Sequence, residues 1–127
     1  MNLEKVVFAF FIVLALTVNF GFFVGDMDSI HHHNVYELYA AVVVNLIATV
    51  LKFGDRTHMG AVLLATSLVA DLHLIIAALA WAVTVHAMGW TLGPEVMGIV
   101  VSLSGGALLA NIISVVLLVT GTVMLRR

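Results

Sequence analysis

The chain lacks cysteine altogether, contains a single proline, and has little charge of either sign. Only 9% of its 127 residues are Asp, Glu, Lys or Arg. The absence of cysteine excludes disulfides, thiolate catalysis and Cys-ligated zinc or iron–sulfur sites. Five Lys and Arg residues stand against seven Asp and Glu residues, for a net charge of −2. The chain therefore offers no basic surface for phosphates, and nucleic acid is excluded as a partner.

Apolar residues, by contrast, are abundant. They make up 63% of the chain, and the mean hydropathy is +1.20. An ordinary soluble domain is about a quarter charged and about half apolar. A chain of 13.6 kDa has too large a surface for its volume to hide this many apolar side chains from water. The composition predicts an integral membrane protein and excludes a soluble enzyme.

Charges and turn residues divide the chain into four long apolar segments. They predict helices over residues 6–24, 35–53, 59–88 and 97–125. About 20 helical residues cross the roughly 30 Å of hydrocarbon in a bilayer. We therefore expect an all-α integral membrane protein whose residues 1–127 form a single transmembrane domain, an up-and-down bundle of four transmembrane helices.

The basic residues predict the orientation of such a bundle. Lys5 precedes the first helix, Lys52 and Arg56 flank the turn between the second and third, and Arg126 and Arg127 follow the fourth. With four spans, all five basic residues fall on one side of the membrane. By the positive-inside rule, the N and C termini are both expected to be cytoplasmic.

Asp71 is the only acidic residue that lies deep inside a predicted helix. At 1.5 Å per residue it is about 17 Å from the cytoplasmic end, near the bilayer midplane. A charged carboxylate there costs at least about 2.5–3.5 kcal/mol on insertion scales. Asp71 is therefore a candidate titrating or cation-attracting group. The alternative is a structural hydrogen-bonding role.

Other polar side chains are expected at similar depths, and we consider them with Asp71 as candidates for an ion pathway. They are Asn19, Asn45, Ser67, His73 and Asn111. Ser67 lies one turn from Asp71 on the same side of the helix, whereas His73 is about 200° around it. The alternative is that the asparagines form hydrogen bonds between helices and that His73 is a hydrogen-bonded core residue.

A stripe of small residues, Gly106, Ala110 and Ser114, follows one face of the fourth predicted helix. Small side chains allow helix backbones to approach closely, and packing drives helix association in lipid. We interpret the stripe as a helix-packing surface, either within the chain or against another subunit. Pore lining is the alternative.

The connector before the second helix holds the densest polar chemistry in the chain. Asp26 and Asp28, with Glu37 just beyond, would form an acidic outer mouth that concentrates cations if the chain oligomerises. His31 and His33 alternate with their neighbour in an extended loop and could share a metal ion with one of these aspartates. The alternatives are a pH-sensitive vestibule and a solvated loop that binds nothing.

Several stretches of the sequence resemble a family of short, uncharacterised four-helix inner-membrane proteins of proteobacteria. The stretches are residues 19–23, 35–41, 52–56 and 63–72. The resemblance implies a bacterial inner-membrane location. It brings neither an established activity nor catalytic residues.

These features favour a small oligomeric inner-membrane protein that passes ions, namely cations, by passive conduction. One alternative is an accessory or scaffold subunit that packs against an unknown membrane partner, and another is a metal-binding membrane protein. We recognise no catalytic constellation and predict that the protein is not an enzyme. The expected partners are the lipid bilayer and further copies of the chain. No cofactor is expected unless a cation or divalent metal binds.

Overall fold

Four long helices form the part of the chain that the computed structural model describes, which is residues 3–24, 35–54, 58–89 and 93–125. They are α1 (Leu3–Val24), α2 (Val35–Lys52), α3 (His58–Ala82) and α4 (Pro94–Leu125). A single π-helical turn, η2 (Val83–Ala87), continues α3 without a break. The prediction of an all-helical bundle is confirmed.

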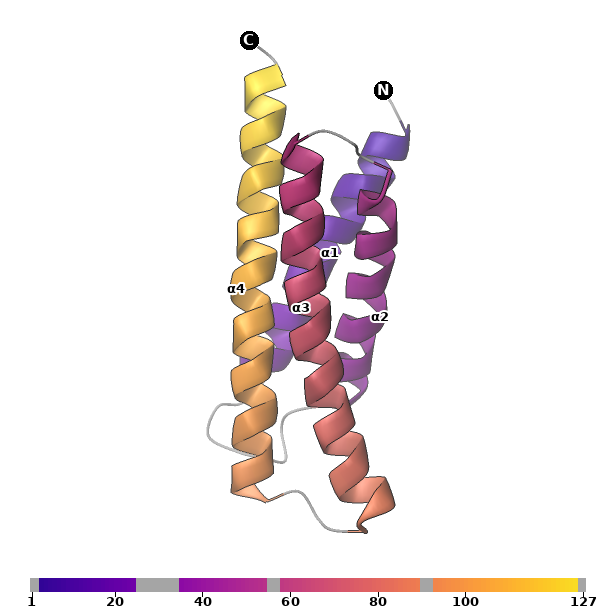
Figure 1. Cartoon of the computed structure of the whole chain (residues 1–127), viewed down its shortest axis with the longest axis vertical. Coiled ribbons are helices and arrows are strands. Elements are labelled where there is room, and N and C mark those ends of the chain that lie inside the picture. Colours follow the sequence, from indigo (N-terminus) through magenta and orange to yellow (C-terminus); the bar gives the residue numbers. More distant parts are fainter. Residues whose placement is uncertain (1–2, 25–34, 55–57, 90–92, 126–127) are drawn as a thin grey trace.

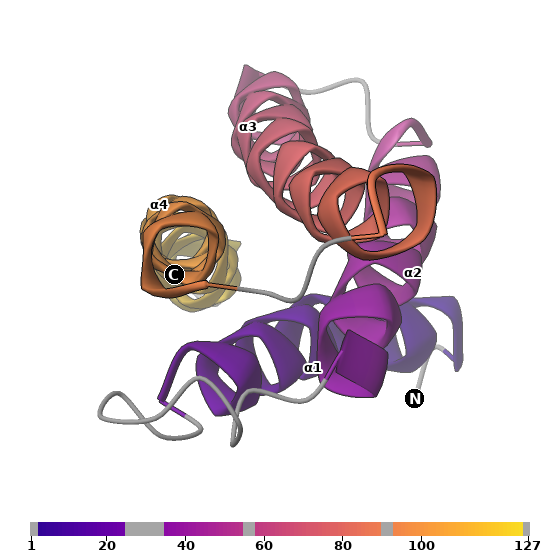
Figure 2. The same cartoon turned by 90° about the horizontal axis from the view of Figure 1, so that it is seen from below.

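The helices run alternately up and down, so the start of α1 and the end of α4 lie at the same end of the bundle (Figure 1). Viewed along the bundle, the helices surround a common interior (Figure 2). α1 packs against α2 and α4, and α3 packs against the same two helices. Side chains from all four helices can therefore meet in the centre.

The number of candidate membrane spans differs from the prediction. Among the described residues, three helices are long and apolar enough to cross a membrane: Leu3–Val24, Met59–Ala87 and Glu95–Met124. This finding indicates a membrane protein, but the prediction of four transmembrane helices is wrong. The cytoplasmic position of both termini was predicted from four spans, so that prediction is no longer supported.

The helix that fails to qualify is α2, and its length gives the physical reason. It has 18 residues, the fewest of the four long helices. At 1.5 Å per residue it extends about 27 Å, which is short of the roughly 30 Å of hydrocarbon. α2 is therefore too short to be a candidate span, although most of its residues are apolar.

The ends of α3 and α4 also differ from the predicted bounds. In place of one helix over residues 59–88, α3 ends at Ala82 and the π-helical turn is closed by the Met88 N–H donating to the Val83 carbonyl at 3.0 Å. Gly89 follows with a φ of 69°, a left-handed conformation that glycine adopts without strain. α4 begins at Pro94, three residues earlier than expected, because proline suits the first helical position, where no N–H is needed.

Large apolar side chains lie both in the core and over the outside of the bundle. Phe22, Leu38, Leu74 and Val100 are fully buried, and the Phe22 ring lies 6.3 Å from that of Trp81. The exposed large apolar side chains come from every helix and include Phe10, Val43, Val50, Leu72, Leu79, Leu109 and Val116. Such an extended apolar exterior is typical of a surface that contacts lipid or another protein.

Candidate functional site

Buried polar side chains occupy the centre of the bundle, and all four helices contribute to them. We call nine of these residues the polar column: Asn19, Asn45, Thr49, Lys52, Ser67, Asp71, Ser104, Asn111 and Ser114, each of which is at most 6% exposed. Ser104 and Ser114, at its two limits on α4, are ten residues apart and so about 15 Å apart along the axis. Polar groups thus lie inside the molecule while apolar groups cover its exterior.

Lys52 is the least expected member of the polar column. It is the last residue of α2, yet it is only 1% exposed. Its Nζ donates hydrogen bonds to Ser67 Oγ at 2.5 Å and to Ser114 Oγ at 3.0 Å. The Thr66 hydroxyl lies 2.6 Å from that of Ser114 and extends this cluster. Because helical side chains lean toward the N-terminus of their helix, a lysine at this position reaches back into the bundle.

Asp71 lies next to this cluster, and its carboxylate accepts a hydrogen bond from α2. The Thr49 hydroxyl is 2.5 Å from Asp71 Oδ2 and 2.8 Å from the Asn45 carbonyl oxygen. Its single hydrogen is assigned to the shorter contact, with the carboxylate. The other carboxylate oxygen, Oδ1, is buried and has no hydrogen-bond partner among the described residues.

The charges of Lys52 and Asp71 act on each other inside the bundle. Removing an isolated ammonium or carboxylate from water costs several kcal/mol, so each buried charge depends on the opposite charge and on its hydrogen bonds for compensation. The hydroxyls of Thr49, Ser67 and Ser114 supply those hydrogen bonds.

The three asparagines of the polar column form a second set of contacts. Asn111 Nδ2 donates to Asn19 Oδ1, and Asn19 Nδ2 donates to the Ser104 carbonyl oxygen, both at 3.0 Å. These bonds link α1 to α4. Asn45 Nδ2 donates at 2.7 Å to the Ala41 carbonyl oxygen within its own helix.

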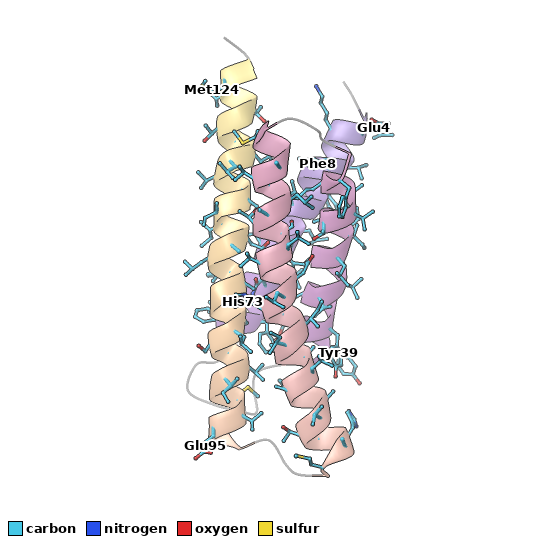
Figure 3. The ribbon with its side chains drawn as sticks, in the orientation of Figure 1. Glu4, Phe8, Tyr39, His73, Glu95 and Met124 are labelled. Atoms are coloured by element: carbon cyan, nitrogen blue, oxygen red, sulfur yellow. The ribbon has the colours of Figure 1, made fainter. Side chains whose placement is uncertain are left out.

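His73 lies apart from Asp71, on the side of α3 that faces α4. A Cβ placed on Gly106 would lie only 2.7 Å from His73 Cδ2, so the imidazole ring packs directly on this glycine. Its Nδ1 is 2.8 Å from the Val69 carbonyl oxygen. Figure 3 shows His73 midway along the bundle, between Glu95 at one end and Met124 at the other. Ser114, another residue of the small-residue stripe, contacts Thr66 of α3. Through Gly106 and Ser114, the stripe of α4 therefore packs against α3.

The predicted outer mouth and metal site lie mostly outside the described residues. This is the case for Asp26, Asp28, His31 and His33. Glu37 is described and partly buried, and its Oε2 lies 3.0 Å from the position that a Cβ on Gly21 of α1 would take. Within the described ranges, no three His, Asp or Glu side chains are grouped closely enough to hold a metal ion.

A comparison with known protein families assigns the chain to one of them. The model of a family of unknown function, DUF6394, matches residues 32–122. The chain belongs to this family. The matched segment contains Lys52, Asp71 and Ser114, whereas Asn19 precedes it. No curated protein and no solved structure matches the chain.

Sequence reasoning missed Lys52, Thr49 and Thr66 as members of the site. Lys52 was interpreted as a charge at a helix end that marks the cytoplasmic side, whereas its side chain lies inside the bundle. One signal could have found it, since Asn45, Thr49 and Lys52 are spaced by four and three residues and so share one face of α2. The same face carries Leu38 and Ala41, which are fully buried.

Proposed function

We propose that this protein is a multi-pass protein of the bacterial inner membrane that passes cations, and that the proton is the cation its interior fits best. The observation that carries the proposal is the pair of buried, oppositely charged side chains, Lys52 and Asp71, surrounded by hydroxyl groups in the polar column. Ionisable residues inside membrane proteins commonly mark ion pathways and proton relays.

The close packing of the interior favours a proton over a metal cation. Leu38, Leu74 and Val100 are fully buried on the helices that carry the polar column, so apolar side chains also occupy the interior of the bundle. An alkali-metal ion needs a continuous passage of its own diameter. A proton instead moves by short transfers between hydrogen-bonded groups. The Thr66, Ser114, Lys52 and Ser67 side chains form such a chain, with successive contacts of 2.6, 3.0 and 2.5 Å.

Asp71 is the proton acceptor in this proposal, and its charge acts on the Lys52 ammonium of this chain. Thr49 donates a hydrogen bond to Oδ2, while Oδ1 is buried and accepts no hydrogen bond from the residues that the structure describes. A carboxylate held in this way accepts a proton on Oδ1 and releases it again without first breaking a hydrogen bond at that oxygen. The nearby ammonium of Lys52 stabilises the carboxylate after release.

The route, in this proposal, lies within each chain. The polar groups face the interior and the exterior is apolar, so a passage between subunits would have an apolar lining. We therefore propose that a homo-oligomer, where it forms, packs complete routes side by side in the lipid bilayer.

Proton flux into liposomes tests the proposal. The purified protein is reconstituted with a pH-sensitive dye inside, and a potassium gradient with valinomycin supplies the driving potential. We expect wild-type protein to acidify the interior, and Asp71→Asn to lower the initial rate at least tenfold. Glu95→Gln is the matched control, because it makes the same acid-to-amide change at an exposed residue and should keep the wild-type rate.

Absence of wild-type flux over a range of voltage and pH would overturn the proposal, as would equal rates for wild type and Asp71→Asn. Purification in mild detergent gives an independent measurement. An unrelated membrane protein that co-purifies at fixed stoichiometry, together with absent flux, would support the accessory-subunit function instead.

A further inference from the structure

The ammonium group of Lys52 occupies a position lined with oxygen atoms from two other helices. Ser67 Oγ of α3 and Ser114 Oγ of α4 accept its hydrogen bonds, and Thr66 Oγ1 lies behind Ser114. The negative charge of Asp71 attracts it. The side chain is buried, so this arrangement belongs to the interior and not to a solvated helix end.

This environment is also suited to a free monovalent cation. Hard cations bind oxygen ligands, and pores that conduct potassium replace its water shell with protein oxygens. An ammonium group and a potassium ion are similar in size and carry the same charge. Hydroxyl oxygens beside a carboxylate would therefore accept either one, and they cannot hold both because like charges repel at close range.

We propose that Lys52 makes the polar column selective for protons, because its tethered ammonium fills the position that an alkali-metal cation would otherwise occupy. This inference rests on the proposed function and identifies the residue that determines its selectivity. Lys52 is covalently attached, so it satisfies the oxygen ligands without being transported. A metal cation that approaches Asp71 meets both a filled position and a like charge, whereas protons pass through the hydrogen bonds of the same groups.

Removal of the ammonium should convert this position into a binding site for potassium. The variants are Lys52→Met and Lys52→Gln, both neutral, of which the glutamine can still donate a hydrogen bond to a serine hydroxyl. Lys5→Met is the matched control, because Lys5 lies exposed near the start of α1. The probes are KCl, NaCl and choline chloride at equal ionic strength, since choline is too large for the position.

Two readouts follow. In thermal unfolding in detergent, we expect KCl to raise the Tm of Lys52→Met by at least about 4 °C over choline chloride. Wild type and Lys5→Met should show no such difference. In equilibrium dialysis against KCl, Lys52→Met should bind about one potassium ion per chain, whereas wild type and Lys5→Met should bind none. The double variant Lys52→Met/Asp71→Asn should lose the potassium effect, because the counter-charge is absent.

The outcomes separate this inference from the proposed function. Potassium-dependent stabilisation of the Lys52 variants supports the inference even when wild type passes no protons, in which case only the proposed function fails. If wild type passes protons but the Lys52 variants respond equally to potassium and choline, the inference is overturned and the proposed function stands. Folding of Lys52→Met in KCl but not in choline chloride also supports it, and failure of both variants to fold in any of the salts overturns it.

Discussion

Thr49 of α2 and Asp71 of α3 are joined by a 2.5 Å hydrogen bond between Oγ1 and Oδ2, and Asp71 Oδ1 is left without a partner among the described residues. This bond turns the carboxylate toward α2, whereas His73, two residues further along, packs on Gly106 of α4. α3 thus presents different polar groups to its two neighbours. The hydrogen bond fixes the orientation of the carboxylate and leaves one oxygen open.

Replacement of Thr49 by valine should destabilise the protein. Valine has nearly the same shape but no hydroxyl, so both oxygens of Asp71 would be buried without a donor. Leaving a buried polar group unsatisfied costs about 1–3 kcal/mol in free energy of unfolding, which unfolding in mixed micelles measures. Thr17→Val is the control, because the Thr17 side chain is exposed and bonds only to the Leu14 carbonyl of its own helix. Equal effects of the two changes would refute the role given to Thr49.

The bond between Asn19 and Asn111 should appear as a coupling energy between α1 and α4. A double-mutant cycle with Asn19→Leu and Asn111→Leu isolates it from the individual costs of the two changes. Interhelical hydrogen bonds in membrane proteins contribute about 0.6 kcal/mol on average, with a maximum of about 1.7 kcal/mol. We expect a value in this range from the same unfolding assay. Additive effects of the two substitutions would contradict a hydrogen bond between Asn111 Nδ2 and Asn19 Oδ1, which lie 3.0 Å apart.

Gly106→Ala should destabilise the α3–α4 contact. The new Cβ would lie 2.7 Å from His73 Cδ2, so the imidazole ring must move. Overpacking of this kind costs about 1–3 kcal/mol. Gly98→Ala on the same helix is the matched control, because nothing lies within 4 Å of its Cβ position. There the gain in helix propensity should stabilise the protein by about 0.5–1 kcal/mol. Opposite signs for the two glycines are the expected result.

Neutralisation of one member of the Lys52 and Asp71 pair should cost more than neutralisation of both. Removing one of two buried opposite charges takes away part of the other's compensation, which costs at most the roughly 3–5 kcal/mol lost when a direct buried ion pair is broken. We expect Asp71→Asn and Lys52→Met each to show such a loss in choline chloride. The double variant should be more stable than either single variant. A double variant at the sum of the two losses would show that the charges do not act on each other.

The sequence predicted the four helices well but wrongly predicted that α2 is long enough to span a membrane. Long apolar runs define α1, α3 and α4 because a helix that contacts lipid carries apolar residues on most of its surface. α2 is also mostly apolar, but with 18 residues it is shorter than the other three long helices. The sequence pattern counted its apolar residues as a span that just sufficed.

The candidate site was only partly predictable from the sequence. Asp71 was found because an acidic residue in the middle of an apolar helix is conspicuous. Lys52 was not, because a lysine at a helix end normally extends into water, and a shared helix face with Asn45 and Thr49 does not by itself show that it turns inward. Its burial depends on Ser67 and Ser114, which lie 15 and 62 positions away in the chain.

The sequence by itself determined that this is an all-helical membrane protein with a deep carboxylate, because composition and hydropathy set which residues can face lipid. Only the tertiary structure decided which polar groups meet. It directed Lys52 into the bundle, turned Asp71 toward Thr49, and paired Asn19 with Asn111. The physical reason is that hydrogen bonds between side chains depend on how the helices pack and rotate against one another, and that arrangement depends on all four helices together.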